Sequence, residues 1–306
     1  MFTKLIVQPV FNLLVLIYAL LPGHNFGMAI IIFTIIVRLL MWPLVKKQLH
    51  HAKAMRELQP ELKRIKKESK GDKQKESQLV MELYKEREIN PFSSIGLLIV
   101  QIPILIALYS CIQRIVKDPS AIINFSYPIL HNLSWMKQLS ADIHLFDSTL
   151  FGIVDLTKPA LEKGGGIYWP AMIIVAASAI TQYYQSKQLL PSDKDSKSLR
   201  QILSSAGQGK GTDQSEVNAA VGRTTRFFVP AMVFIFTVNL PSALSLYWLT
   251  SGIVAIIQQS RVLKKDEEEL ETPTTAKDLK TKEVIEAEVL PPKKTKKKTS
   301  KKKRRK

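Results

Sequence analysis

The chain alternates between long apolar blocks and highly charged segments. Residues 27–45 (GMAIIIFTIIVRLLMWPLV) are apolar over about the thickness of a bilayer and carry a single charge, Arg38. Comparable apolar blocks follow at 91–115, 167–187, 227–240 and 241–262. Blocks of this kind are typical of transmembrane helices, so the pattern predicts an all-α membrane protein with five transmembrane helices.

The segments between the blocks indicate which side of the membrane each one faces. Residues 46–90 contain 13 Lys and Arg against 8 Asp and Glu, with apolar residues at helical spacing and a break at 69–72. This pattern predicts a cytosolic helical hairpin, because cytosolic loops carry an excess of positive charge. Residues 116–166 carry no such excess and are predicted to be extracytoplasmic.

These features divide the chain into ten predicted segments. They are an N-terminal helix (1–22), transmembrane helix 1 (23–45), the cytosolic helical hairpin (46–90), transmembrane helix 2 (91–115), the extracytoplasmic loop (116–166), transmembrane helix 3 (167–187), a cytosolic loop (188–226), transmembrane helix 4 (227–240), transmembrane helix 5 (241–262) and a disordered basic cytosolic tail (263–306). The apolar run in 1–22 is interrupted by Gln8, Pro9 and Asn12, so that an interfacial helix and a transmembrane helix are both compatible with it.

Arg38 is the residue that most needs an explanation. A central arginine costs roughly 2.5–3.5 kcal/mol on insertion scales, so something must solvate it. It lies about 10 Å from the cytosolic end of its helix at 1.5 Å per residue, which permits snorkelling to the inner headgroups. The alternative is a polar cavity within the membrane, open to the cytosol, with Arg38 as its positive pole.

Other polar residues in the blocks favour the cavity. Three pairs stand four residues apart and therefore share helix faces, and jointly they could line a hydrophilic groove. The pairs are Thr34 with Arg38, Ser178 with Gln182, and Tyr247 with Ser251. Each alone would more often bond a neighbouring helix.

Enzymatic chemistry has no recognisable basis in this sequence. No acidic residue lies in any block, and there is no phosphate-binding glycine loop, no His/Cys cluster at metal-ligand spacing and no Ser/His/Asp arrangement. Cys111 is the only cysteine, which excludes an intramolecular disulfide. We therefore expect no enzyme activity, no cofactor and no metal site. The net charge of +18 follows from the cytosolic segments without invoking nucleic acid.

Several longer stretches resemble a known family. Over about residues 8–263 the sequence is similar to the YidC/Oxa membrane protein insertases, in the form without a large extracytoplasmic domain. The resemblance lies in QPVFNLL, IIIFTIIVRLLMWPLVKKQ, MRELQPELKRIKK, LYKEREINPF, LLIVQIPILIALY and VPAMVFIFTVNLPSALSLYWLTSGIVAIIQQ.

The resemblance implies five transmembrane helices around a hydrophilic groove that is open to the cytosol and to lipid and closed on the outer side. It implies that 1–22 is an interfacial helix, that the groove arginine is Arg38, and that Gln101, Gln182 and Trp248 also line the groove, with Tyr247 able to take the place of its neighbour. It also implies a mobile cytosolic hairpin and basic tails that engage the ribosome.

The function hypothesis is a membrane protein insertase of the plasma (inner) membrane, multi-pass with a cytosolic C-terminus. The substrate groove would comprise Arg38, Thr34, Gln101, Gln182, Tyr247, Trp248 and Ser251. Its partners would be nascent membrane proteins, the lipid bilayer and the ribosome, through the basic tail 293–306, with a Sec-type translocon left open. The tail, with 11 Lys and Arg in 14 residues, would equally bind anionic lipid. The alternatives are a small-anion channel or transporter and a non-catalytic assembly scaffold.

Overall fold

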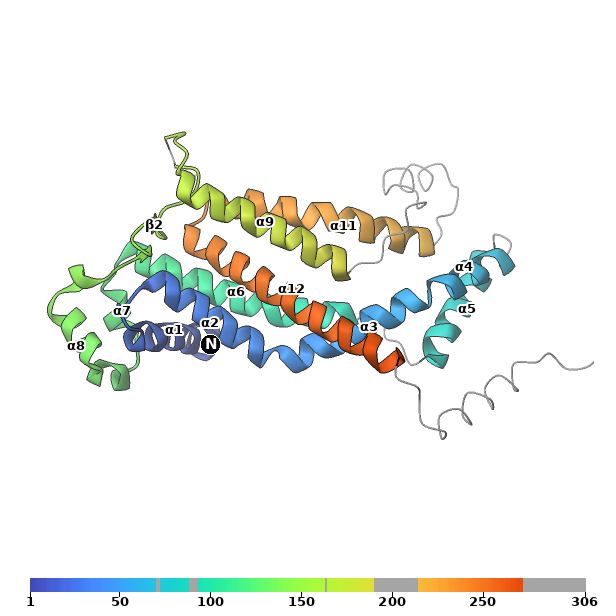
Figure 1. Cartoon of the computed structure of the whole chain (residues 1–306), viewed down its shortest axis with the longest axis horizontal. Helices are drawn as coiled ribbons and strands as arrows, with labels where there is room; N and C mark the ends of the chain where they lie inside the picture. The colour runs from blue at the N-terminus through green and yellow to red at the C-terminus, as the bar shows by residue number, and fades with distance from the viewer. Residues whose placement is uncertain (70–71, 88–92, 163, 190–213, 272–306) are drawn as a thin grey trace, which may run out of the picture. The chain divides into compact units, whose positions relative to one another are not determined.

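The computed structural model describes residues 1–69, 72–87, 93–162, 164–189 and 214–271, and the described chain is mostly helical (Figure 1). Residues Met1–Val262 form one compact unit, and the packing below is that of this unit. The longer helices are α1 (Gln8–Leu20), α2 (Phe26–Leu40), α3 (Trp42–Glu57), α4 (Gln59–Glu68), α5 (Lys73–Glu86), α6 (Ser93–Lys117), α8 (Ser134–Ala141), α9 (Trp169–Leu189), α11 (Gln214–Thr237) and α12 (Ser242–Glu271).

The N-terminal segment is one continuous helix. A π-helical turn at Thr3–Val7 leads into α1, and together they give 18 residues that are long and apolar enough to cross a membrane. The polar interruptions do not break it. Asn12 donates to the carbonyl of Gln8 in its own helix and accepts from the backbone N–H of Tyr127, in the segment predicted to be extracytoplasmic. An interfacial position for this helix stays a prediction.

The arginine-bearing helix is bent within the predicted span 23–45. α2 ends at Leu40, and the chain bends by 61° before continuing as α3. The cause is Pro43, which has no N–H to donate and whose ring would clash with the carbonyl four residues earlier. Arg38 therefore lies in the last turn of α2, next to the bend.

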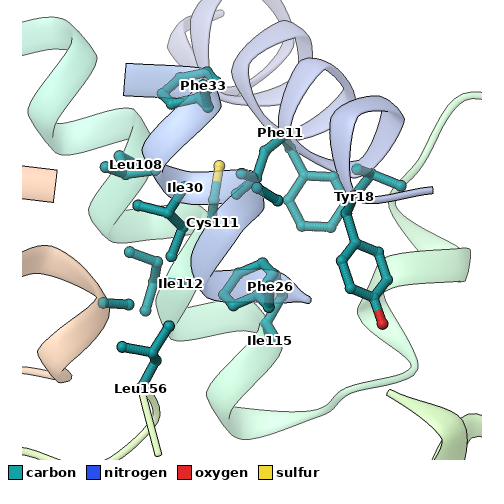
Figure 2. Close-up of a cluster of buried hydrophobic side chains, with 14 of the residues drawn as sticks. Phe11, Tyr18, Phe26, Ile30, Phe33, Leu108, Cys111, Ile112, Ile115 and Leu156 are labelled. Atoms are coloured by element: carbon teal, nitrogen blue, oxygen red, sulfur yellow. The ribbon is translucent and has the colours of Figure 1, made fainter. Parts of the chain in front are cut away.

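A buried apolar core joins α1, α2 and α6 (Figure 2). Phe11, Ile30, Leu108 and Cys111 are fully buried there, and Leu156 joins them from the segment predicted to be extracytoplasmic. Lipid is as apolar as these side chains, so close packing and van der Waals contact hold such helices together rather than transfer out of water.

The segment predicted to be extracytoplasmic folds over one end of the helices. It contains α7 (Ala121–Asn124), α8, and a short antiparallel pair, β1 (Thr149–Leu150) and β2 (Val154–Asp155). The backbone N–H of Phe26 and the side chain of Asn25 both donate to Asp147, and Asn25 also caps α2. These bonds fasten the segment to the start of α2.

The same segment supplies partners to the last two helices. The N–H groups of Ser242 and Ala243, unpaired within α12 because they lie at its start, donate to the carbonyls of Lys158 and Leu156. The N–H of Leu161 donates to the carbonyl of Val238, just past the end of α11. One short stretch, 156–161, therefore satisfies the facing ends of both helices.

Helices α4 and α5 lie in the predicted cytosolic hairpin. Leu58, Leu62, Leu83 and Tyr84 form a small cluster between them. Asp72 caps α5 by accepting from the N–H groups of Gln74 and Lys75. In Figure 1 this pair lies at the end of the unit opposite α7 and α8.

Two helices extend past the predicted segment boundaries near the C-terminus. α11 begins at Gln214 within the predicted loop 188–226, and α12 continues to Glu271 beyond the predicted start of disorder at 263. Hydropathy marks where a helix leaves the apolar region, whereas Ala, Leu, Lys and Glu sustain helix in water as well. Residues 190–213 and 272–306 lie outside the described residues.

Hydropathy singles out fewer helices than the five predicted spans. In the described residues Thr3–Leu20 and Val100–Lys117 are long and apolar enough to cross a membrane, and the bent pair α2–α3 is a third if it is counted as one span. Arg226–Thr237 is a shorter apolar helix. Buried polar side chains lower the hydropathy of α9 and α12, and two of those on α12, Ser251 and Gln258, contact Arg38.

Candidate functional site

Arg38 is buried, and among the described residues it bonds one side chain. Only 6% of the residue is exposed, and its Nε donates to Oγ of Ser251 on α12 at 2.7 Å. Among the described residues no carboxylate forms an ion pair with it. A desolvated guanidinium that has no counter-charge favours the arrival of an anionic group or of water.

Helix α12 supplies most of the polar surface around Arg38. Tyr247 and Ser251 are one turn apart and 2–3% exposed, and the amide of Gln101 on α6 donates to the hydroxyl of Tyr247. The structure thus links α2, α6 and α12 through polar side chains, and it brings together four of the seven residues that the sequence singled out.

The remaining three predicted residues play other parts. Thr34 is fully buried and donates to the carbonyl of Ile30 in its own helix. Gln182 is half-buried on α9 and has no hydrogen-bond partner among the described residues. Trp248 is half-buried and lines an apolar groove rather than the Arg38 cluster.

That apolar groove lies between α6, α11 and α12 and has a volume of about 460 Å³. Its lining residues are Leu105, Ile106, Tyr109, Met232, Val233, Phe236, Leu240, Leu244 and Trp248. Because Tyr247 belongs to the polar cluster and its neighbour lines the groove, adjacent residues of α12 connect a polar environment with an apolar one.

Helix α9 approaches α12 closely at Gly252. A Cβ added there would lie 2.6 Å from Oγ1 and 2.9 Å from Cβ of Thr181. Only glycine permits this approach, which places the helix that carries Gln182 against the turn of α12 that holds Arg38. The polar stripe of α9 is otherwise satisfied locally, since Ser178 and Thr181 donate to carbonyls of their own helix.

Sequence reasoning gave no role to Gln258. This residue is 2% exposed, and its side-chain N–H donates to the carbonyl oxygen of Arg38 at 3.1 Å. The signal that could have identified it is its position seven residues after Ser251, which places both on one face of α12.

Metal binding has no structural counterpart in the part of the chain that the structure describes. No group of three or more His, Cys, Asp or Glu side chains is close enough there to hold an ion. Cys111 is buried in the apolar core, away from the polar cluster.

Comparison with known proteins identifies the family. The family described as 60Kd inner membrane protein matches residues 17–269. The membrane protein insertase YidC of Fusobacterium nucleatum is 29% identical over 79% of this chain and 87% of its own length, and that of Rickettsia bellii is 29% identical over 86% of this chain and 39% of its own length. The chain thus spans most of one relative and about two fifths of the other. It belongs to the 60Kd inner membrane protein family, that of the YidC insertases, which confirms the family resemblance and places it among multi-pass membrane proteins.

Proposed function

We propose that this protein is a membrane protein insertase in which Arg38 draws a short anionic segment of the substrate into a hydrophilic groove among five transmembrane helices. The observation that carries the proposal is the buried guanidinium, which binds Ser251 through Nε and meets no carboxylate in the described residues. An arriving acidic segment would supply the missing counter-charge. It would then cross less than the full hydrocarbon thickness of about 30 Å.

The apolar groove beside the polar cluster provides for the other half of the substrate. An inserting chain has a polar part, which needs hydrogen-bonding partners, and an apolar helix, which needs an apolar surface until it reaches lipid. Tyr247, in the polar cluster, would offer hydrogen bonds to the polar part of the substrate, and Trp248, in the apolar groove, would contact its apolar helix. Both parts would therefore be accommodated side by side. A small-anion transporter has no use for an apolar groove of about 460 Å³, which favours the insertase.

The orientation we propose puts the cluster around Arg38 toward the cytosol. The basic hairpin 46–90 and the basic tail would be cytosolic, and the segment fastened to the start of α2 would close the outer side. The groove would thus open inward in a plasma membrane, with the C-terminus in the cytosol.

The test of the mechanism is the insertion of substrates with acidic and neutral translocated segments by reconstituted full-length protein. We expect Arg38→Ala to reduce insertion of the acidic substrate about tenfold or more, equivalent to about 1.4 kcal/mol, and Arg38→Lys to retain part of it because the positive charge remains. Equal insertion by Arg38→Ala and wild type would refute capture by charge.

The basic tail is proposed to bind the ribosome. Deletion of 293–306 should reduce ribosome co-sedimentation, and binding by the intact chain should weaken steeply with salt because each Lys or Arg displaces a counterion from RNA. Undiminished co-sedimentation after the deletion would instead assign the tail to anionic lipid. A Sec-type translocon as partner is a further proposal, and crosslinking from residues of α2 during insertion would test it.

A further inference from the structure

The bend after α2 leaves the backbone around Arg38 short of hydrogen-bond donors. The regular ladder ends where the N–H of Met41 bonds the carbonyl of Val37 at 3.0 Å. In an uninterrupted helix the next donors would be Trp42, for the carbonyl of Arg38, and the residue at 43, which is proline and has no N–H. A buried carbonyl without a donor is costly, so the bend needs outside partners.

Gln258 supplies the donor for Arg38. Its side chain is 2% exposed and donates through Nε2 to the carbonyl oxygen of Arg38 at 3.1 Å. One turn further along α12, Val262 packs against Met41, Val45 and other apolar residues at the bend. α12 therefore contacts the bend with both a polar and an apolar side chain.

The same helix also holds the other end of Arg38. Ser251 accepts from its Nε, and Gln258 donates to its backbone carbonyl, seven residues or about two turns later. Holding Arg38 at both its backbone carbonyl and its Nε restricts the freedom of the long side chain and directs its Nη atoms at one region.

We propose that Gln258 is a positioning residue for the insertase site. By bonding the carbonyl of Arg38 it stabilises the bend between α2 and α3 and keeps the guanidinium where it meets substrate. The effect of Gln258 on substrate insertion rests on the proposed function, whereas its effect on the bend can be measured independently.

The chain offers a matched control in the neighbouring glutamine. Gln259 is also 2% exposed, and Oε1 of each glutamine has no hydrogen-bond partner among the described residues. Of these two glutamines, only Gln258 bonds Arg38 in the described residues. Gln258→Met and Gln259→Met remove the same amide from the same helix and retain similar volume, so they differ in the bond to Arg38. Gln258→Leu is a second variant if Gln258→Met yields no folded protein.

The bend is measured by the distance between spin labels at Ile32 on α2 and Glu57 on α3, in the full-length chain with Cys111 replaced by Ala. With a 1.5 Å rise per residue, the 61° bend puts the two sites about 33 Å apart along the helix axes, against about 38 Å for a straight helix. We expect Gln258→Met to lengthen or broaden the distribution, and Gln259→Met to match the parent.

Function is measured by insertion of acidic and neutral substrates. We expect Gln258→Met to reduce insertion of the acidic substrate about five- to tenfold, the equivalent of one lost buried hydrogen bond, while the neutral substrate changes less. Unchanged distances and unchanged acidic insertion in Gln258→Met would overturn the assignment, as would equal losses from both glutamine variants. If Arg38→Ala also inserts normally, the proposed function fails, and the distance measurement still decides whether Gln258 holds the bend.

Discussion

Replacing Gly252 by alanine should separate α9 from α12. The new Cβ would lie 2.6 Å from Oγ1 and 2.9 Å from Cβ of Thr181, well inside van der Waals contact. Rotating Thr181 relieves only the first contact, and it would break the bond from Oγ1 to the carbonyl of Ser178. The Cβ is fixed to the backbone, so the helices themselves must move apart by several tenths of an ångström.

Overpacking of this kind typically costs about 1–3 kcal/mol. For a protein of this size 1 kcal/mol corresponds to about 2–4 °C in Tm, so Gly252→Ala should lower the melting temperature of the detergent-solubilised chain by roughly 2–12 °C. Gly166→Ala is the control, because the nearest atom to its added Cβ is 3.5 Å away.

A double-mutant cycle makes the reasoning specific. Thr181→Ala removes the closer of the two contacts, so in the Gly252→Ala background it should cost less than in the wild type, or should stabilise. The close approach would be refuted if Gly252→Ala melts like Gly166→Ala, or if the two substitutions are additive.

Three further predictions concern other parts of the molecule. Gly27→Ala should loosen segment 116–166 from α2, because the added Cβ would lie 2.6–2.9 Å from side-chain and backbone atoms of Leu150. Increased protease cleavage in 116–166 would show this loosening, and unchanged cleavage would contradict it. Ser251→Ala should destabilise the protein by about 1.5–3 kcal/mol, because it removes a hydrogen bond to a charged group. Ser251→Thr retains a hydroxyl and should not lower stability in this way. Equal melting temperatures of the two variants would argue against this hydrogen bond. Burial raises the pKa of Tyr84 above its ordinary value near 10, so the unfolded chain loses this proton first and stability should fall as pH rises past about 10. The denaturation midpoint of Tyr84→Phe should fall less over the same pH range. Equal pH dependence of the midpoint in the two proteins would refute this prediction.

The sequence was sufficient for features that depend on composition and short-range periodicity. The apolar blocks, the isolated Arg38 and the i, i+4 pairing of Tyr247 with Ser251 are visible without coordinates. The bend near Met41 was not predicted, because the hydropathy pattern runs through Pro43 without a break, although proline has no N–H for the carbonyl four residues earlier.

The contacts that hold the site together could not be predicted, because they join residues far apart in the chain. Arg38 and Gln258 are separated by 220 positions, and the fit of Gly252 against Thr181 depends on interhelical distance. A glutamine near the end of an apolar helix and a glycine within it have many ordinary roles, so neither residue type points to a partner. The sequence pattern indicated which helices carry polar faces, and the packing determined which of these faces meet.

The short stretch 156–161, which bonds the facing ends of α11 and α12, has a consequence for biogenesis. It precedes both helices in the chain and so leaves the ribosome first. The hydrogen-bond partners for the facing ends of α11 and α12 are therefore already synthesised when these two helices emerge, so the assembly of the last two helices would depend on residues that precede them.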